Sequence, residues 1–196
     1  MTGAKRKEYS LSWGGRSLEL GKRTCIMGVL NVTPDSFSDG GSYFNRERAI
    51  EQGIALARDG ADILDIGGES TRPYSDPVPE GQELERVIPV IEGLRKEVGI
   101  PISIDTCKAE VARQAVNSGA SIINDISALR FDRGMASVAA EKGVPVVLMH
   151  MQGTPGDMQA NPSYHDLITE IIDFLKAAAG RAVAAGIRRE MIIVDP

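Results

Sequence analysis

Short apolar runs in this sequence repeatedly end in polar residues, and these residues have the types and the spacing to do chemistry. The polar positions are Asn31, the segment 67–72, Asp105, Asn124, His150 and Asp195. A carboxylate beside a buried apolar run is costly unless some group donates hydrogen bonds to it. Two carboxylates and an amide around one pocket would suit a planar ligand with adjacent N–H groups, because a carboxylate accepts two parallel bonds at once. The same oxygens could instead bind a metal ion, and any one of these residues could simply cap the next helix.

The longest polar stretch, residues 31–41, follows the first of these apolar runs. It contains Asp35, Pro34 and a pair of glycines at 40–41, which are typical of a loop. In α/β proteins, loops at the carboxyl ends of buried strands carry the chemistry. A solvated turn is the alternative, but the apolar ring of Phe37 in the middle of the loop favours a segment that covers a ligand.

The elements that must position these residues form a repeat. Five segments with helical spacing end in a glycine followed by a small or branched apolar residue, a helix stop signal. The glycines are Gly60, Gly99, Gly119, Gly143 and Gly186. A short apolar strand follows each stop, at 63–66, 101–104, 121–123, 145–149 and 191–194. With a strand at 25–30, strand and helix alternate with a period of roughly 33 residues, which predicts a parallel sheet with right-handed crossovers.

Further patterns refine this picture. The strand at 25–30 is apolar on both faces, so we expect it to be buried on both. Two helices carry apolar stripes: one has Leu84, Val87, Ile88 and Ile91, and the other has Leu167, Ile168, Ile171, Ile172 and Leu175. Residues 161–166, with Ser163 followed three residues later by Asp166, are a start signal for the second of these helices. Residues 8–20 alternate around a pair of glycines and predict a hairpin that covers the bottom of the core.

A closed (β/α)8 TIM barrel takes about 250 residues, whereas this chain of 196 residues ends at the mouth of its sixth strand. We therefore expect a single domain, residues 1–196, formed by the first six βα units of a TIM barrel with an N-terminal β-hairpin, the last two units being absent. A six-stranded doubly wound sheet is the alternative. In a barrel, all the polar positions named above would converge on one mouth.

Composition narrows the functional classes. A net charge of −5 gives no support for nucleic-acid binding, which usually requires a basic patch. No segment approaches the roughly 20 apolar residues of a membrane helix, and no signal peptide is recognisable. The two cysteines, Cys25 and Cys107, have neither disulfide-framework nor metal-site spacing, so we expect a cytoplasmic protein.

Six motifs, in order, resemble those of the dihydropteroate synthase family. They are G-V-L-N-V-T-P-D-S-F-S-D-G-G (28–41), D-I-G-G-E-S-T-R-P (65–73), S-I-D-T (103–106), I-N-D-I (123–126), M-H-M-Q-G-T-P (149–155) and V-D-P (194–196). The resemblance implies that 6-hydroxymethyl-7,8-dihydropterin diphosphate condenses with 4-aminobenzoate, releasing pyrophosphate and giving dihydropteroate. It also implies inhibition by sulfonamides, which compete with aminobenzoate.

The resemblance also implies roles for individual residues. The pterin would be bound by Asp105, Asn124, Met149 and Asp195. Asn31 would contact the Mg²⁺ that accompanies the diphosphate. The catalytic loops would contribute Asp35, Phe37, Thr71 and Arg72, and the aminobenzoate ring would lie against Phe37 and Pro73. The full-length protein is expected to be a homodimer.

The resemblance also marks what these 196 residues lack. The family continues past residues 194–196 with a lysine, an arginine and a histidine that bind the pterin carbonyl and the diphosphate, so we expect this fragment alone to be inactive. One alternative is a methyltetrahydrofolate:corrinoid-protein methyltransferase, which would share the pterin contacts but should lack the long loop at 31–41. A non-catalytic pterin-binding module is the other alternative.

Overall fold

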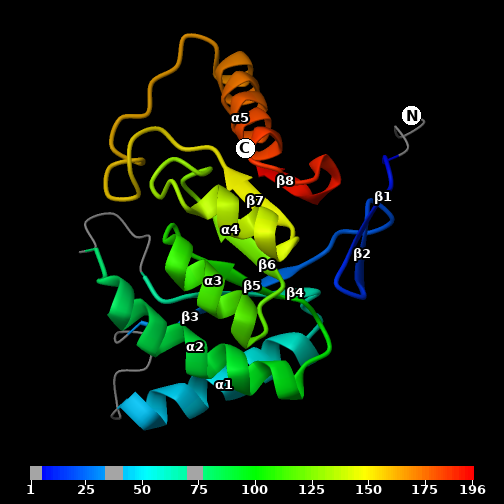
Figure 1. Cartoon of the computed structure of the whole chain (residues 1–196), viewed down its shortest axis with the longest axis vertical. Helices are drawn as coiled ribbons and strands as arrows, with labels where there is room; N and C mark the ends of the chain where they lie inside the picture. Colours follow the sequence, from blue (N-terminus) through cyan, green and yellow to red (C-terminus); the bar gives the residue numbers. More distant parts are fainter. Residues whose placement is uncertain (1–5, 34–41, 70–76) are drawn as a thin grey trace.

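The computed structural model describes residues 6–33, 42–69 and 77–196 (Figure 1). The strands are β1 (Tyr9–Trp13), β2 (Arg16–Leu20), β3 (Met27–Asn31), β4 (Ile63–Gly67), β5 (Ile102–Asp105), β6 (Ile122–Asp125), β7 (Val146–Met149) and β8 (Ile192–Asp195). The helices are α1 (Ser42–Arg58), α2 (Glu80–Glu97), α3 (Ala109–Ser118), α4 (Met135–Lys142) and α5 (Leu167–Ala184), and a 3-10 turn, Arg189–Met191, precedes β8.

The main sheet contains six parallel strands, and their order in space, β3-β4-β5-β6-β7-β8, is their order in the sequence. A doubly wound sheet would reverse its order at a switch point, so that alternative is excluded. Helices connect successive strands, and Figure 1 shows α1 to α4 along one side of the sheet. The fold prediction is confirmed: the chain forms six consecutive strands of a TIM barrel preceded by an antiparallel hairpin.

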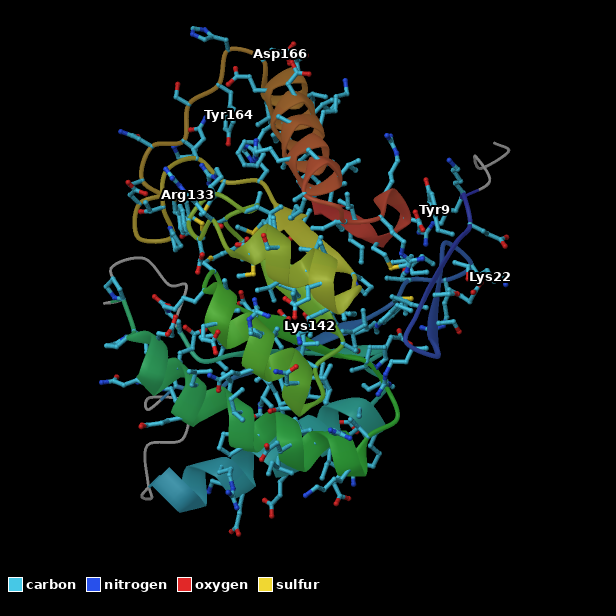
Figure 2. The ribbon with its side chains drawn as sticks, viewed as in Figure 1. Tyr9, Lys22, Arg133, Lys142, Tyr164 and Asp166 are labelled. Atoms are coloured by element: carbon cyan, nitrogen blue, oxygen red, sulfur yellow. The ribbon has the colours of Figure 1, made fainter. Side chains whose placement is uncertain are left out.

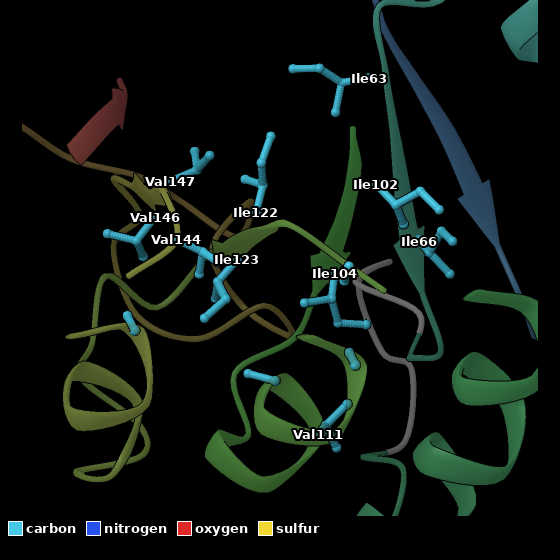
Figure 3. Packing of buried hydrophobic residues seen from close by; sticks show 14 of the residues in the cluster. Ile63, Ile66, Ile102, Ile104, Val111, Ile122, Ile123, Val144, Val146 and Val147 are labelled. Atoms are coloured by element: carbon cyan, nitrogen blue, oxygen red, sulfur yellow. The ribbon is translucent and has the colours of Figure 1, made fainter. Parts of the chain in front are cut away.

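One row of side chains fixes which face of the sheet meets the helices. Leu30, Ile66, Ile104, Ile123 and Val146 are successive register partners across β3 to β7, and all five are fully buried. A methyl group on Gly53 of α1 would lie 3.4 Å from the Leu30 side chain, so this row faces the helices. Figure 3 shows Ile104 and Ile123 near α3, the helix that carries Val111. The alternating residues of each strand must face the barrel interior.

Four of the five predicted helix stops have the expected backbone conformation. Gly60, Gly119, Gly143 and Gly186 all have positive φ, which glycine adopts without steric cost. Gly99 does not, and this part of the prediction was wrong. Helix α2 ends at Glu97, and its C-cap is Val98 in an extended conformation, with the Val98 N–H bonded to the Leu94 carbonyl. An extended cap needs no glycine.

Two predictions about burial were also wrong. The interior face of β3 is exposed, with Val29 56% exposed, and the α5 stripe is exposed at Leu167, Ile168 and Ile172. The reason is that β3 and β8 are the two edges of the sheet in the described chain, so each has one neighbouring strand. Only the part of α5 that carries Leu175, Ala178 and Ala182 is buried.

The start of α5 differs from the prediction as well. Asp166, not Ser163, is the N-cap, and its side chain accepts a hydrogen bond from the Thr169 N–H. Figure 2 shows Asp166 at the outer end of α5. Ser163 instead lies in the preceding loop, where its N–H donates to the Gln152 side chain over 3.1 Å.

The N-terminal hairpin lies at the end of the sheet opposite the strand C-termini. Leu11, Trp13 and Leu18 are buried in the core, and Arg16 donates to the Gly99 carbonyl, just before β5. The hairpin therefore covers the bottom of the core, as the sequence predicts. Within the ranges described, we find no helix of the length and apolarity that a bilayer span requires.

Candidate functional site

Residues at the C-terminal ends of four neighbouring strands form one row on the interior face of the sheet. Asn31, Gly67, Asp105 and Asn124 are successive register partners on β3 to β6. The sequence analysis placed the polar residues just after the strands. In the structure they belong to the strands: Asn31, Gly67 and Asp105 are the last residues of β3, β4 and β5, and Asn124 is the last but one of β6, so the pleat fixes the direction of each. A Cβ on Gly67 would lie 3.5 Å from Asp105 Oδ2 and 3.6 Å from Asn31 Oδ1. The bare glycine thus leaves open the space beside these two oxygens.

Met149 and Asp195 lie one pleat nearer the mouth on the next two strands. Val147 is the register partner of Asn124, so Met149, two residues later, points to the same interior face, and Met149 pairs with Asp195 on β8. The structure therefore brings Asn31, Asp105, Asn124, Met149 and Asp195 to one end of one face. The other predicted site residues, Asp35, Phe37, Thr71, Arg72 and Pro73, lie outside the described residues.

His150 does not join this group, contrary to the expected convergence of all the polar positions. Its ring packs edge-on against Phe174 of α5, with ring centroids 4.9 Å apart, and lies 5.9 Å from the ring of Tyr164. Its backbone N–H donates to the Asp195 carbonyl over 2.8 Å. Burial lowers the pKa of His150, and the nearby Arg130 acts in the same direction. His150 therefore supports the end of β8 from the helix side.

Asp65 is a site carboxylate that sequence reasoning missed. It occupies the middle of β4, two residues before Gly67 on the interior face, and is only 3% exposed. Asn124 Nδ2 donates to Asp65 Oδ2 over 2.9 Å, reaching across β5. The sequence signal was present, because Asp65 interrupts an apolar strand at an interior-facing position, but the predicted site residues lie at strand ends and in the loops that follow them.

The carboxyl group of Asp105 has an unusual protonation equilibrium. Burial raises its pKa to about 8, and the negative charges of Asp65, Glu83, Asp125 and Glu69 act in the same direction. At neutral pH the free protein thus holds a proton here, whereas a ligand that donates two hydrogen bonds favours the carboxylate. Binding of such a ligand is expected to release a proton.

We therefore predict that replacing Asp105 by asparagine stabilises the ligand-free protein increasingly as pH rises from about 4 to about 8. The native pKa is raised, so in this window the native state holds a proton that the unfolded state has lost, and wild-type stability falls with pH. A full proton difference gives a slope of about 1.4 kcal/mol per pH unit. Partial exposure at the mouth makes the expected slope smaller.

Denaturant unfolding of both proteins at pH 5, 6, 7 and 8 measures this difference. A stability difference that stays constant across the series would contradict the assignment of the titration to Asp105.

A cluster of three charges lies behind Asp105. Lys108, at the N-cap of α3, forms ion pairs with Glu69, which follows β4, and with Glu83 of α2, which is fully buried. Burial opposes the charge on Lys108, but the bonds to both glutamates outweigh it, and the pKa of Lys108 is raised. Gly68 lets α2 approach, because a Cβ there would lie 2.8 Å from Val87 Cγ1 and 2.9 Å from Glu83 Cγ. Glu69, which directly precedes residues 70–76, is thus anchored through Lys108 to the start of α3 and to Glu83 of α2.

Asp125, adjacent to Asn124, is a second functional residue that the sequence did not single out. It is fully buried on the helix side of β6 and accepts from the Ser127 N–H at 2.8 Å, the Ser127 hydroxyl at 2.6 Å and the Leu129 N–H at 2.9 Å. These bonds hold Ala128 and Leu129 at positive φ, an uncommon conformation for residues with a side chain. The tight turn after β6 fixes the strand end that carries Asn124.

A cavity of about 380 Å³ adjoins Asp105 at the mouth. Its lining includes Glu69, Asp105, Cys107, Ile126, Phe131 and Pro155. A mostly apolar wall with a few polar groups is typical of small-molecule sites.

Asn31 is a described residue that could contribute to binding a metal ion together with a ligand. Within ranges 6–33, 42–69 and 77–196, no group of three His, Cys, Asp or Glu side chains could hold a metal. Mg²⁺ typically keeps several waters and binds through one or two protein oxygens together with substrate phosphates. Asn31 Oδ1, at the exposed end of the row, could supply one such oxygen.

Comparison with known proteins gives consistent matches. A family model described as pterin-binding enzyme matches residues 27–196. The dihydropteroate synthase of Synechocystis sp. is 49% identical over 183 residues, which cover 93% of this chain and 63% of that relative. The chain thus spans less than two thirds of the length of this relative.

Solved structures agree. Dihydropteroate synthase of Xanthomonas albilineans with 4-aminobenzoic acid superimposes with a TM-score of 0.87 at 48% identity, covering 97% of this chain and 67% of that one. The complex of the enzyme from the same bacterium with 7,8-dihydropteroate gives a TM-score of 0.82 at 45% identity, covering 95% and 65% of the two chains.

Proposed function

Since this chain belongs to the family of pterin-binding enzymes, we propose that the complete protein containing it is a dihydropteroate synthase. The proposed reaction joins 6-hydroxymethyl-7,8-dihydropterin diphosphate to 4-aminobenzoate. The observation that carries the proposal is the interior row of Asn31, Asp105 and Asn124, together with Asp195 on β8. A row of acceptors at the mouth of a barrel matches a ligand whose pyrimidine edge is rich in N–H donors.

In this proposal the pterin lies across the interior face of the sheet. Asp105 and Asp195 accept from its ring N–H and amino groups, Asn124 binds beside Asp105, and Met149 packs on the ring. Charged acceptors give stronger hydrogen bonds than neutral ones. The ring is thereby held with its methylene carbon toward the open mouth.

The chemical step is a displacement at that methylene carbon. The amine nitrogen of 4-aminobenzoate forms a bond to the carbon, the carbon–oxygen bond to the diphosphate breaks, and the amine loses a proton. Mg²⁺ bound to the diphosphate, with Asn31 as a ligand, would neutralise the charge of the leaving pyrophosphate.

The remaining roles fall on residues outside the described ranges. We assign Asp35, Thr71 and Arg72 to the loops that close over the substrates and exclude water. Phe37 and Pro73 would form the apolar slot for the aminobenzoate ring. The anchoring of Glu69 by Lys108 supports this assignment, because it fixes one end of the segment that carries Thr71, Arg72 and Pro73.

The other expectations remain proposals. Residues 1–196 would act as one pterin-binding domain, and the complete protein would be a homodimer. Cys25 and Cys107 are both free thiols, which fits a reducing cytoplasm.

The decisive experiment incubates the complete protein with Mg²⁺, the pterin diphosphate and 4-aminobenzoate. We expect dihydropteroate and pyrophosphate in equal amounts, and neither product when one substrate is omitted. Pterin binding without turnover would support the non-catalytic module instead. Methyl transfer from methyltetrahydrofolate to a corrinoid protein would support the methyltransferase, which the loop at 31–41 and the synthase relatives disfavour.

A further inference from the structure

Asp65 is a buried carboxylate for which the proposed reaction has no role. It is 3% exposed, with Leu64 and Ile66 on either side fully buried. Within the part of the chain that the structure describes, no cation forms an ion pair with it, and its Oδ1 has no hydrogen-bond partner. Burial of an incompletely bonded carboxylate is costly, and structural roles rarely require it. The position of this group in the row beneath the mouth indicates a functional reason.

The neighbours of Asp65 offer little compensation. Ser103, its register partner on β5, favours the charged carboxylate, but the Ser103 hydroxyl has no hydrogen-bond partner in the structure. The effect of burial therefore prevails, and the pKa of Asp65 is raised. Its one well-formed side-chain bond among the described residues is the 2.9 Å bond from Asn124 Nδ2.

That bond removes an ambiguity from the amide of Asn124. A carboxamide has a donor end and an acceptor end of nearly equal shape, so packing alone does not select between its two orientations. As the acceptor of this bond, Asp65 Oδ2 selects the orientation in which the NH₂ group points down toward Asp65. The oxygen and the second N–H of Asn124 then remain for a ligand, side by side. Such a donor–acceptor pair is how asparagine recognises a ring nitrogen beside an amino group.

We propose that Asp65 is a positioning residue whose carboxylate orients the Asn124 amide so that its oxygen and one N–H face the bound pterin. This inference rests on the proposed function, and it assigns recognition of the amino group and the adjacent ring nitrogen to Asn124. Asp105, the register partner of Asn124, would bind the remaining part of the pterin edge. Asp65, which lies deeper in the interior face, thus orients the side chain of Asn124 nearer the mouth.

A double-mutant cycle on the complete protein tests the proposal, with 6-hydroxymethylpterin as the probe in calorimetry. Asp65→Asn keeps the shape, but its amide can donate or accept and so no longer fixes Asn124. We expect it to weaken binding about tenfold, which corresponds to about 1.4 kcal/mol. In an Asn124→Ala background, Asp65→Asn should have no further effect. A tenfold loss that persists in that background would overturn the proposal, because Asp65 would then act without Asn124.

A second measurement needs no ligand and stays decisive if the protein binds no pterin. In wild-type protein, the two side-chain N–H protons of Asn124 should exchange with solvent at clearly different rates by NMR, because one is held by Asp65 and the other faces the mouth. Asp65→Ala should make both exchange fast. Equal rates in the wild type would overturn the proposal, and the melting temperature of each variant separates this result from a loss of folding.

Discussion

Replacing Asp105 or Asp195 by alanine is expected to weaken binding of the pterin diphosphate to the complete protein by about 100-fold or more. A hydrogen bond to a charged group contributes about 1.5–3 kcal/mol, and each pterin N–H that loses its acceptor in the site adds a further penalty of about 1–3 kcal/mol. Losing about 3 kcal/mol corresponds to a factor above 100. Asp105→Asn should also weaken binding, because one acceptor oxygen becomes a donor that faces the ligand's own N–H.

Calorimetry on each variant measures this loss, and a thermal melt confirms that each still folds. Asp173→Ala is a suitable control, since its side chain is 69% exposed on α5, away from the interior face. Wild-type affinity in either Asp105→Ala or Asp195→Ala would show that the carboxylate concerned does not bind the pterin edge.

The sequence predicts the arrangement of strands and the polar row for the same physical reason. Parallel strands joined by helices all end at one edge, so Asn31, Asp105, Asn124 and Asp195 had to meet once the alternation was recognised. The pleat of each strand then fixes the face to which a side chain points. Met149 and Asp195 face the interior, whereas His150 lies on the other face and packs on Phe174. Expecting His150 to converge on the mouth with the other polar positions was an error of one position in a pattern with a period of two.

Contacts between distant parts of the chain account for the rest. Asp65 reaches Asn124 across an intervening strand, and Lys108 joins Glu69 to Glu83, pairings that no local pattern encodes. Burial is equally non-local. The apolar residues of β3 and the first turns of α5 resemble core, yet they are exposed because their neighbours are missing from the described residues.

The exposed apolar residues lead to the second large effect: residues 1–196 produced alone are expected to self-associate. The two edge strands expose Ile26, Met27 and Val29 at β3 and Val194 at β8, and α5 adds Leu167, Ile168 and Ile172. An exposed apolar edge strand offers unpaired N–H and C=O groups to a second chain. We therefore expect oligomers at micromolar concentration and a broad, low-temperature melt.

Charged side chains on the edge strands β3 and β8 should reduce this self-association. Val29 is 56% exposed and Val194 is 48% exposed, so Val29→Lys with Val194→Lys adds charge without breaking well-packed contacts. Lysine on an edge strand opposes pairing with a second chain. Light scattering after gel filtration should show a shift toward monomer. Tyr9→Lys is the matched control: Tyr9 is 53% exposed but lies on β1 of the separate two-stranded sheet, and its replacement should leave the oligomers unchanged. A wild-type fragment that is monomeric with a sharp, reversible melt would mean that the open barrel edges are stable in water, and that apolar exposure at β3 and β8 does not drive association.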